Sequence, residues 1–458
     1  MIANSISIPP ESPAKGAGMS RRSTEFCDGI SRRSVVKAGL TGLMGLSLPE
    51  ILRLKAQAAE KGSSKNDTAI IFLELAGGPT QHETYDPKPN APSDYRGPLS
   101  AISTAVPGVQ FSEFMKEQAR VLDKMAIIRS IHHDSGSHST SSHLTQTGYY
   151  LSDRQNRENE MPSIGCITSK VRGSNADGIP AYVSLPRDMR FGRAAWLGKG
   201  FNPFITARDA DAKNFTVPNL TLLRGLTAER MQDRKALLKS FDATREIIDN
   251  NGVGDAMDQY TKEAFEMVSG DSARNAFDLS QEDQKTRDRY GMNSFGQNIL
   301  LARRLVEHGV TVASVRVTGP SWDDHRDLVK RMREKGIPYD RAFAALVEDL
   351  HERGLDKKVM VVAMGEFGRT PKFNKTAGRD HWGRVMSVAL AGGGIKTGQV
   401  IGASDEQGGT PADAPYRPEN VLAMLYRHLG IDPATTFRDH SGRPRYILER
   451  RELITELI

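Results

Sequence analysis

Short apolar runs alternate along the chain with segments in which apolar residues recur at helical spacing. Apolar runs that stop at glycine or at charged residues are typical of buried strands. We predict strands at 68–73, 125–130, 179–186, 310–317, 359–364 and 387–390. We predict helices at 228–250, 255–267, 298–308, 339–353 and 418–429. The repeated alternation predicts an α/β fold with a mostly parallel central sheet and helices on both faces.

The residues that follow the predicted strands include most of the candidate chemistry. In an open α/β sheet, ligands bind beyond the carboxyl ends of the strands, and parallel strands share that edge. The candidates, in chain order, are Glu83 and Asp86, His138, Asp323 and His325, Glu366, and the pair Asp380 and His381. We therefore expect these side chains to converge at one edge of the sheet.

The side-chain types at these strand ends are those that bind metal ions. Four of the 11 histidines lie between 132 and 143, which favours a metal or phosphate-like site over a polar turn. Imidazole suits zinc and similar ions, whereas carboxylates suit magnesium, calcium or manganese. We expect a mononuclear or dinuclear site for a divalent metal ion, namely zinc, calcium, magnesium or manganese. A surface loop with solvated ion pairs is the alternative.

Two arginines near the last of these strand ends are candidates for binding an anion. A metal ion at the site would polarise an ester oxygen or generate hydroxide near neutral pH. The guanidinium of Arg369 or Arg379 could then hold an oxyanion through paired hydrogen bonds. Such an arrangement would suit chemistry at an ester oxygen with an oxyanion nearby.

Composition and charge describe an ordinary globular protein. Of the 458 residues, 38% are hydrophobic and 26% are charged. The net charge is +6, but residues 1–58 hold eight Lys/Arg and four Asp/Glu, which leaves 54 against 52 in the remainder. This near-neutral remainder argues against a nucleic-acid partner. With Cys27 in the expected leader, Cys166 alone can form neither an intramolecular disulfide nor a cysteine-based zinc site.

The first 58 residues have the pattern of a twin-arginine export signal. Residues 31–37 read Ser-Arg-Arg-Ser-Val-Val-Lys, a short apolar run follows at 38–48, and Ala56-Gln57-Ala58 is a small-x-small cleavage pattern. The apolar run is too short for a stable membrane span. We expect a bacterial protein that the twin-arginine machinery exports to the periplasm or beyond. A basic amphipathic surface helix is the alternative.

These signals divide the chain into a leader, a linker and one large domain. We assign 1–58 to the signal peptide, 59–67 to a polar linker and 68–440 to the α/β domain. Within that domain, 150–290 is expected to be a largely helical and loop insertion, and 441–458 a C-terminal tail.

Six motifs distributed over nearly the whole chain support a family resemblance. They are Gly77-Gly78-Pro79, Tyr85-Asp86-Pro87-Lys88-Pro89, Trp322-Asp323-x-His325, Gly365-Glu366-Phe367-Gly368-Arg369-Thr370-Pro371, Gly378-Arg379-Asp380-His381-Trp382 and Leu390-Ala391-Gly392-Gly393-Gly394. They resemble the exported, sulfatase-like DUF1501 family that is abundant in planctomycetes. More distantly, their order resembles the alkaline phosphatase superfamily, which includes arylsulfatases and phosphodiesterases.

The resemblance implies an alkaline phosphatase-like fold and roles for several site residues. Asp323 and His325 resemble the aspartate and histidine of one metal site, and His381 resembles the late histidine that returns to it. Glu366 occupies the place of the strand-end Asp-His of a second site. The segment 129–148 resembles the sulfatase segment in which the nucleophile lies ten residues before the final glycine, which here is His138.

Two positions depart from the superfamily pattern. His138 stands where the superfamily has Ser, Thr or a modifiable Cys, and Phe367 replaces the expected histidine of the second site. Three outcomes are open: attack by metal hydroxide without a covalent intermediate, a nucleophilic Ser137 or Ser139, or loss of catalysis with binding retained.

These inferences lead to a functional hypothesis with two alternatives. We predict an exported metal-dependent hydrolase of sulfate or phosphate esters, acting on small molecules or polysaccharides. The expected metal ligands are Asp323, His325, Glu366 and His381, with Glu83 and Asp86 as further ligands. His138 and Asp380 would lie at the reacting centre, and Arg369 or Arg379 would clamp the anion. The alternatives are a non-catalytic metal-, anion- or glycan-binding protein and a structural partner of other exported proteins.

Overall fold

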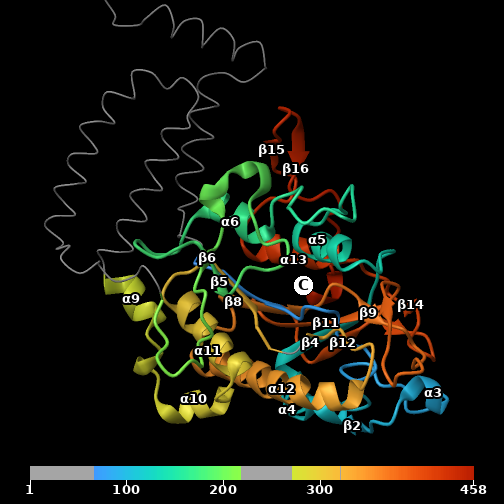
Figure 1. The fold of residues 1–458 in the computed structure, drawn as a ribbon. Coiled ribbons are helices and arrows are strands. Elements are labelled where there is room, and N and C mark those ends of the chain that lie inside the picture. Colours follow the sequence, from blue (N-terminus) through green and yellow to red (C-terminus); the bar gives the residue numbers. More distant parts are fainter. Residues whose placement is uncertain (1–66, 218–270, 320) are drawn as a thin grey trace, which may run out of the picture. The chain divides into compact units, whose positions relative to one another are not determined.

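The computed structural model describes residues 67–217, 271–319 and 321–458 (Figure 1). The predicted leader at 1–58, most of the linker and the helices predicted between 228 and 267 lie outside the described residues. At the centre is an eight-stranded sheet with the order β12-β4-β11-β8-β1-β7-β5-β6. In that order the strands are Gln399–Ile401, Met125–Ile131, Met386–Gly392, Val359–Met364, Ala69–Glu74, Val312–Arg316, Tyr182–Pro186 and Phe204–Ile205.

The sheet is mostly parallel, as the sequence predicts, and all six predicted strands are confirmed. The central strand β1 pairs in parallel with β7 and β8, so that Ile71 lies opposite Ala313 and Val361. The strand predicted at 387–390 is β11, which runs antiparallel to both β8 and β4. This strand is the antiparallel exception in a mostly parallel sheet. Two adjacent parallel strands need a crossover connection, usually a helix, that returns the chain to the edge where the first strand began. The segment between β8 and β11 contains no helix, so β11 runs in the opposite direction to β8.

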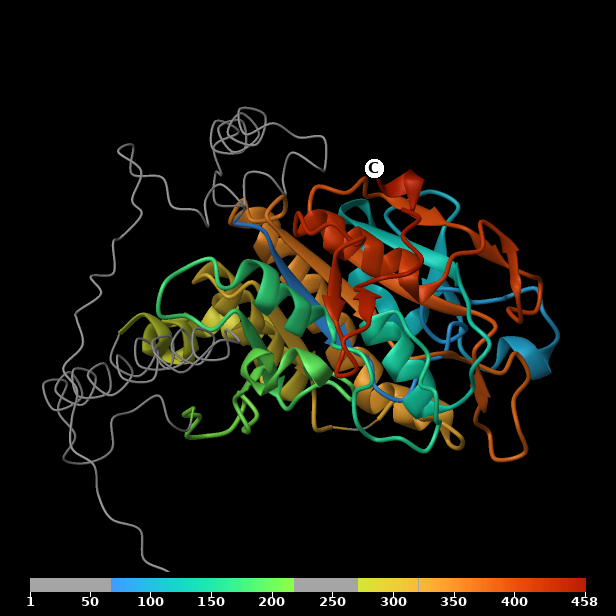
Figure 2. The ribbon, with the colours of Figure 1, turned by 90° about the horizontal axis from the view of Figure 1, so that it is seen from above.

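Helices cover both faces of the sheet, as Figures 1 and 2 show. The side chains of β1 alternate between two hydrophobic cores: Ile71 and Leu73 point into one, and Ile70 and Phe72 into the other. On the first face lie α4 (Lys116–Arg120), α9 (Asp271–Phe277), α10 (Gln284–Tyr290), α11 (Ser294–Glu307) and α12 (Leu328–Glu352). On the second face lie α5 (His138–Thr147), α6 (Ile164–Arg172) and α13 (Pro418–His428).

The predicted helices at 298–308 and 418–429 are confirmed by α11 and α13. The helix predicted at 339–353 is the second half of the longer α12, which continues through Pro338. The sequence did not indicate α5, because Leu144 is its one apolar residue and its other buried residues are Ser, Thr, Gln and His.

The remaining elements are short and lie around the sheet. Four two-stranded ribbons are formed by β2 (Ala101–Ser103) with β3 (Gln110–Ser112), β9 (Gly368–Arg369) with β10 (His381–Trp382), β13 (Ala403–Ser404) with β14 (Pro411–Asp413), and β15 (Thr436–Arg438) with β16 (Pro444–Tyr446). The other short helices are α3 (Ser93–Arg96) and the 3-10 turns η1 (Glu113–Met115), η2 (Leu122–Lys124), η3 (Ala195–Leu197), η4 (Lys199–Phe201), η5 (Leu279–Gln281) and η6 (Thr455–Leu457).

The residues set apart as a C-terminal tail, 441–458, are packed into the domain. Ile447, Leu448, Ile454 and Leu457 are buried in the second core, against α13 and its neighbours. Within the described part of the chain, no helix is both long and apolar enough to cross a membrane.

Candidate metal centre at the carboxyl edge of the sheet

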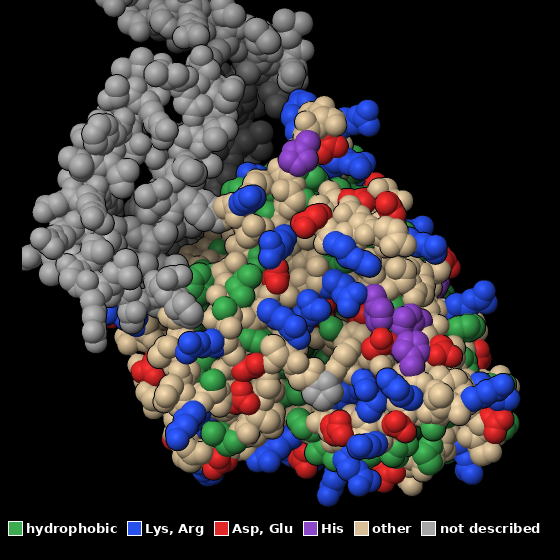
Figure 3. All heavy atoms as spheres, viewed as in Figure 1, with side chains coloured by type: hydrophobic (Ala, Val, Ile, Leu, Met, Phe, Trp, Pro, Cys, Tyr) green, Lys and Arg blue, Asp and Glu red, His purple; other side chains and the backbone are tan. Residues whose placement is uncertain are grey.

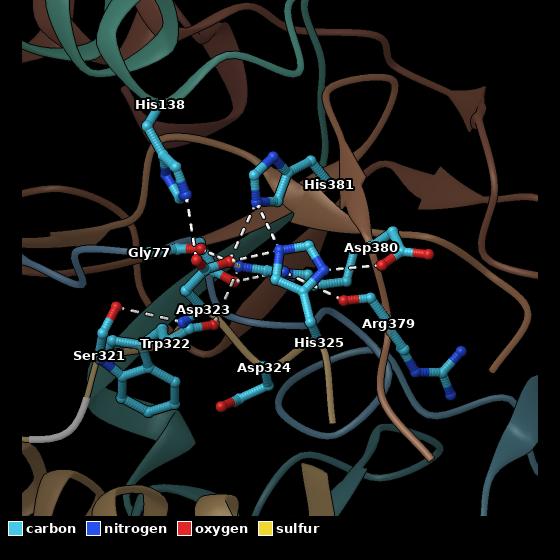
Figure 4. A network of polar contacts seen from close by, with 12 residues as sticks. Gly77, His138, Ser321, Trp322, Asp323, Asp324, His325, Arg379, Asp380 and His381 are labelled. Carbon is cyan, nitrogen blue, oxygen red and sulfur yellow. Dashed lines mark hydrogen bonds and ion pairs between the residues drawn. The ribbon is translucent and has the colours of Figure 1, made fainter. Parts of the chain in front are cut away.

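Three histidines and an aspartate meet at the edge where the parallel strands end (Figure 4). Asp323 and His325 lie in the loop after β7, and His138 is the first residue of α5, which follows β4. His381 lies in β10, just before β11 begins. Because β11 is antiparallel, its start lies at the same edge as the ends of its neighbours. The reversed strand is therefore what brings His381 into the site.

The imidazole Nε2 atoms of all three histidines face the Asp323 carboxylate. The Nε2 atoms of His325 and His381 are each 3.0 Å from Asp323 Oδ1, and His138 Nε2 is 3.3 Å from Asp323 Oδ2. The Nε2 atoms of His325 and His381 are also 3.0 Å from each other. The predicted convergence of these four residues is thus present, and His138, Asp323 and His381 have ligand atoms close enough to share one ion.

The opposite ring nitrogen of each histidine is bonded to an oxygen acceptor. His138 Nδ1 lies 2.6 Å from Glu366 Oε1, and His325 Nδ1 lies 2.7 Å from Asp380 Oδ1. His381 Nδ1 lies 2.9 Å from the carbonyl oxygen of Gly136. Since an acceptor at Nδ1 requires the N–H there, each neutral imidazole carries its Nε2 lone pair toward Asp323. This is the arrangement by which proteins orient metal-binding histidines.

When the three imidazoles are neutral, Arg369 alone among the site residues donates a hydrogen bond to the lone pairs that converge here, and this favours a bound cation. If the proton of each ring is on Nδ1, the Nε2 atoms of His325 and His381 both carry lone pairs. These two lone pairs face each other and lie beside the anionic oxygen of Asp323. These contacts are repulsive unless a proton or a metal ion lies between them. The donor set of the site, three imidazoles and a carboxylate, therefore fits a divalent transition metal ion.

The titration of these groups follows the same charge arrangement. Burial opposes protonation of His138, but the carboxylates of Asp323 and Glu366 outweigh burial and raise the pKa of His138 to about 9. Burial would raise the pKa of Asp323, yet hydrogen bonds from His138, His381 and Arg369 hold it far below its ordinary value. The pKa of Glu366 is likewise lowered, because its contact with His138 overcomes burial. Both carboxylates are therefore anionic at neutral pH.

Glu366, predicted as a metal ligand, instead holds His138 in place. Its side chain is almost fully buried, and its two oxygens accept hydrogen bonds from the Gly77 N–H at 3.0 and 2.9 Å. Gly77 has φ +112°, and a Cβ there would lie 2.4 Å from Ser321 Oγ, so this close approach requires glycine. The glycine pair after β1 thus serves the site by binding Glu366.

The predicted anion clamp at Arg369 is corrected by the structure. The guanidinium is fully buried, and Arg369 Nη2 bonds Asp323 Oδ1 at 2.6 Å. Its other hydrogen bonds are to the carbonyl oxygens of Gly77, Gly78, Trp322 and Arg379. With its donors used inside the protein, Arg369 ties together the loops after β1, β7 and β8 and orients the Asp323 carboxylate.

Arg379 and Glu83 also have roles that differ from the predicted ones. The two side chains form a buried paired contact, with N–O distances of 2.7 and 3.0 Å. Arg379 further bonds the carbonyl oxygens of Tyr95, Thr370 and Pro371. The predictions of Arg379 as an anion clamp and of Glu83 as a metal ligand are therefore corrected, because each satisfies the other's charge.

Asp86 is also outside the cluster. Its carboxylate lies 3.0 Å from Lys88 Nζ and 3.5 Å from Arg129 Nε, and it accepts a hydrogen bond from Ser404. These partners neutralise a buried charge, so Asp86 stabilises the fold at this edge rather than binding a metal ion.

Asp380, predicted at the reacting centre, positions His325. Its side chain is 54% exposed, and besides His325 Nδ1 it accepts a hydrogen bond from Asn374 at 3.2 Å.

Phe367 packs its buried ring against the imidazoles of His138 and His381, with centroids 5.0 and 4.5 Å apart. The ring at this position therefore shapes the site by packing.

One supporting group was missed by the sequence analysis. Asp324 is buried beside Asp323 and bonds Lys335 Nζ at 2.5 Å and Arg331 Nε at 2.7 Å. Lys335 also donates to the carbonyl oxygen of Ser321 at 2.6 Å. These bonds fasten the loop that carries Asp323 to the first turns of α12. The Asp-Asp pair in the sequence was the available signal.

A cleft of about 540 Å³ opens directly beside the candidate metal-binding group of Asp323 and the three histidines. His138 and His381 form part of its wall together with Ser137, which lies next to His138. Both serines considered from the sequence line the cleft. Ser139 is buried and its hydroxyl accepts a hydrogen bond from Arg157, whereas Ser137 is partly exposed. The cleft leaves His138 and His381 accessible from outside the protein.

Sequence comparison assigns the chain to a family. A family model described as "Protein of unknown function (DUF1501)" matches residues 67–458. The chain belongs to the DUF1501 family. No curated protein matches it. The resemblance inferred from the six motifs is thus confirmed at the family level.

Several solved structures are similar to this DUF1501 protein. One from Bacteroides thetaiotaomicron, reported with the metabolism of multiple glycosaminoglycans, is 13% identical, with a TM-score of 0.35 and coverage of 80% of this chain and 73% of that chain. A sulfatase from Pseudoalteromonas sp. is 13% identical, with a TM-score of 0.30 and coverage of 84% and 72%. Ps i-CgsB in complex with k-i-k-neocarrahexaose is 10% identical, with a TM-score of 0.34 and coverage of 80% and 72%. Likeness at this level carries no argument about mechanism or substrate.

Proposed function

We propose that this DUF1501 protein is an exported, metal-dependent hydrolase of sulfate or phosphate esters. The observation that carries the proposal is the common orientation of three imidazoles, each bonded at Nδ1 and each turned by Nε2 toward Asp323. This orientation supports a metal site because an imidazole held in this way offers its lone pair to a cation. The twin-arginine pattern at 31–37 supports export.

The residues that would hold the ion are Asp323, His138, His325 and His381. A donor set dominated by imidazole favours zinc or a similar transition metal over calcium or magnesium. A divalent ion at this place supplies Lewis-acid chemistry, polarising an ester oxygen of the substrate. Glu366 and Asp380 orient two of the ligands, and Arg369 fixes the carboxylate of the fourth.

Ser137 is the cleft residue that would contact the ester next to the proposed ligands. Ser137 presents its side chain to the cleft beside His138. A Ser137 hydroxyl that attacks the ester would transfer its proton to a nearby base, and unbound His138 is already protonated at neutral pH because of its raised pKa. This argues against His138 as the acceptor of that proton.

Elemental analysis with matched variants tests the proposal. We expect the purified wild-type protein to contain a stoichiometric transition metal that His381→Ala and Asp323→Ala no longer retain. His440→Ala, at an exposed histidine in the hairpin of β15 and β16, is the control and should keep the metal. Wild type should cleave aryl sulfates or aryl phosphates, and a chelator should abolish the cleavage. The proposal would be refuted by a well-folded wild-type protein that contains no metal and that does not differ from Asp323→Ala in metal content or in ester cleavage.

Binding without hydrolysis is the second candidate function. It is favoured by the presence of His138 at the position where the resembling superfamily has its nucleophile. In that case the metal would be present, no ester would be cleaved, and an anionic glycan would raise the melting temperature. Turnover of any ester that depends on Asp323 would exclude this candidate.

A further inference from the structure

The cleft beside the histidines has a strongly basic wall. Arg154, Arg157, Arg190 and Arg316 line it, and none of the residues that line it is an aspartate or a glutamate. Basic side chains gather beside the histidines on this face of the molecule (Figure 3). Since the chain after residue 58 is close to neutral, with 54 Lys/Arg against 52 Asp/Glu, this concentration of charge is local.

Most of this charge is not neutralised by ion pairs. Arg154 is exposed, and within the described residues neither its side chain nor that of Arg190 forms a hydrogen bond or ion pair with another residue. Arg157 bonds only the hydroxyl of Ser139. Arg316 faces the carboxylate of Glu74 at 3.5 Å and donates to the carbonyl oxygen of Asp188. The charge of Arg190 acts on the carboxylates of Glu74 and Glu366 without an ion pair.

The carboxylates beneath the wall already have partners of their own. Glu74 accepts a hydrogen bond from the Gln146 side chain at 2.9 Å, and Glu366 is bonded to His138 and to the Gly77 N–H. Unpaired guanidinium groups in a concave site attract and bind sulfate, phosphate and carboxylate groups. Phe191, the one Phe, Tyr or Trp among the lining residues, is itself buried, so the cleft offers no exposed ring of these three types for stacking with a nucleic-acid base.

We infer that the cleft binds a second anionic group of the substrate, so that the natural ester is a polyanion such as an oligosaccharide with several sulfate groups. His138 and His381 belong both to the metal-binding group and to the cleft wall. One anionic group would therefore lie at the histidines while its neighbour contacts the arginines. This inference rests on the proposed function and adds the substrate class to it.

Calorimetric binding of a sulfated hexasaccharide in the presence of a chelator tests the inference. The variant R154Q/R157Q/R190Q removes three positive charges from the cleft. The control R96Q/R333Q/R427Q removes three charges from exposed arginines in α3, α12 and α13, away from the cleft. We expect the cleft variant to bind at least about tenfold more weakly and with less salt dependence, and the control to change by less than about twofold.

Further measurements keep the test decisive. Arg154→Glu reverses one exposed, unpaired charge and should weaken binding without affecting folding. Equal affinity of wild type and the cleft variant, equal weakening of the control, or tight binding of the desulfated hexasaccharide would overturn the inference. So would a single-stranded oligonucleotide that binds as tightly as the sulfated hexasaccharide.

The design separates this inference from the proposed function. Because binding is measured without metal, absence of a metal ion would contradict only the hydrolase proposal. If wild type is active, R154Q/R157Q/R190Q should lose kcat/KM for the sulfated oligosaccharide and keep it for a small aryl sulfate. A loss for both substrates to the same extent would contradict the role of the cleft.

Discussion

The histidines of the proposed metal site depend on hydrogen-bond acceptors outside the proposed ligand set. His138 is held by Glu366, His325 by Asp380 and His381 by a backbone carbonyl. Such outer partners fix the tautomer and the ring orientation, and their loss weakens metal binding without removing a ligand. Asp380 is the most accessible of them for a test, because its side chain is half exposed and its removal leaves no buried charge.

We predict that Asp380→Asn lowers the affinity for the metal by about 10- to 100-fold. The amide can still accept the hydrogen bond from His325 Nδ1, but it lacks the negative charge that makes the ring a better donor to a cation. Competition with a fluorescent chelator measures the affinity. Asp177→Asn, at an exposed aspartate in the loop before β5, is the control and should bind the metal as wild type does. An Asp380→Asn protein with unchanged affinity would show that Asp380 does not tune His325.

At the scale of elements, α12 connects the site to the opposite end of the first helical layer. Its first turns hold the loop of Asp323 through Lys335 and Arg331. One turn beyond Lys335, Asp340 accepts hydrogen bonds from the N–H groups of Glu117 and Gln118 at the start of α4, at 2.7 and 2.8 Å. Tyr339, bonded to Tyr85, lies beside it. The same helix therefore anchors a functional loop and the first turn of another helix.

Burial raises the pKa of Asp340 to about 7, against the opposing hydrogen bonds from the Gln118 and Glu117 N–H groups, while the charge of Glu117 adds to the increase. The folded protein thus keeps a proton that the unfolded chain releases near pH 4, so the free energy of unfolding decreases as pH rises from about 4 to about 7. We predict that Asp340→Asn removes this decrease, which is on the order of a few kcal/mol.

Urea unfolding at a series of pH values measures the difference between wild type and Asp340→Asn. Other titrating groups affect both proteins equally, so the comparison isolates Asp340. Identical pH dependence of the two proteins would contradict the raised pKa. Glu334→Gln, at an exposed position of α12, should show the wild-type pH dependence.

At the scale of the whole molecule, the last residues of the chain complete the second core. Leu448 is fully buried, and a Cβ on Gly148, just after α5, would lie 2.3 Å from its Cδ1. Tyr149 donates a hydrogen bond to the carbonyl oxygen of Tyr446 at 2.7 Å. The C-terminal segment therefore supports the end of α5, the helix whose first residue is His138.

We predict that Leu448→Ala lowers the free energy of unfolding by about 2–5 kcal/mol, because it leaves a cavity in a packed core. Thermal or urea unfolding measures the effect. Ile458→Ala, at the exposed C-terminal residue, should change stability by less than about 0.5 kcal/mol. If both variants were equally stable, residues 441–458 would be a dispensable tail.

The sequence by itself determined the strands, the sheet class and the loops that carry the chemistry. A strand in a sheet that is covered on both faces has buried side chains on both sides, so it appears in the sequence as a continuous apolar run. Such a run can be recognised from neighbouring residues alone. The motifs around Asp323, His325 and His381 also pointed to the right strand ends. Local pattern was sufficient for these features because each depends on neighbours in the chain.

Only the tertiary structure decided the direction of β11 and the partner of each charged side chain. Glu366 lies 228 residues from His138, and Glu83 lies 296 residues from Arg379. A carboxylate or a guanidinium looks the same in sequence whether it binds a ligand or neutralises a distant charge. Its role depends on which groups the fold brings within hydrogen-bonding distance. The fold buries Arg369 and Arg379 beside their partners, whereas it places other arginines in the wall of the cleft.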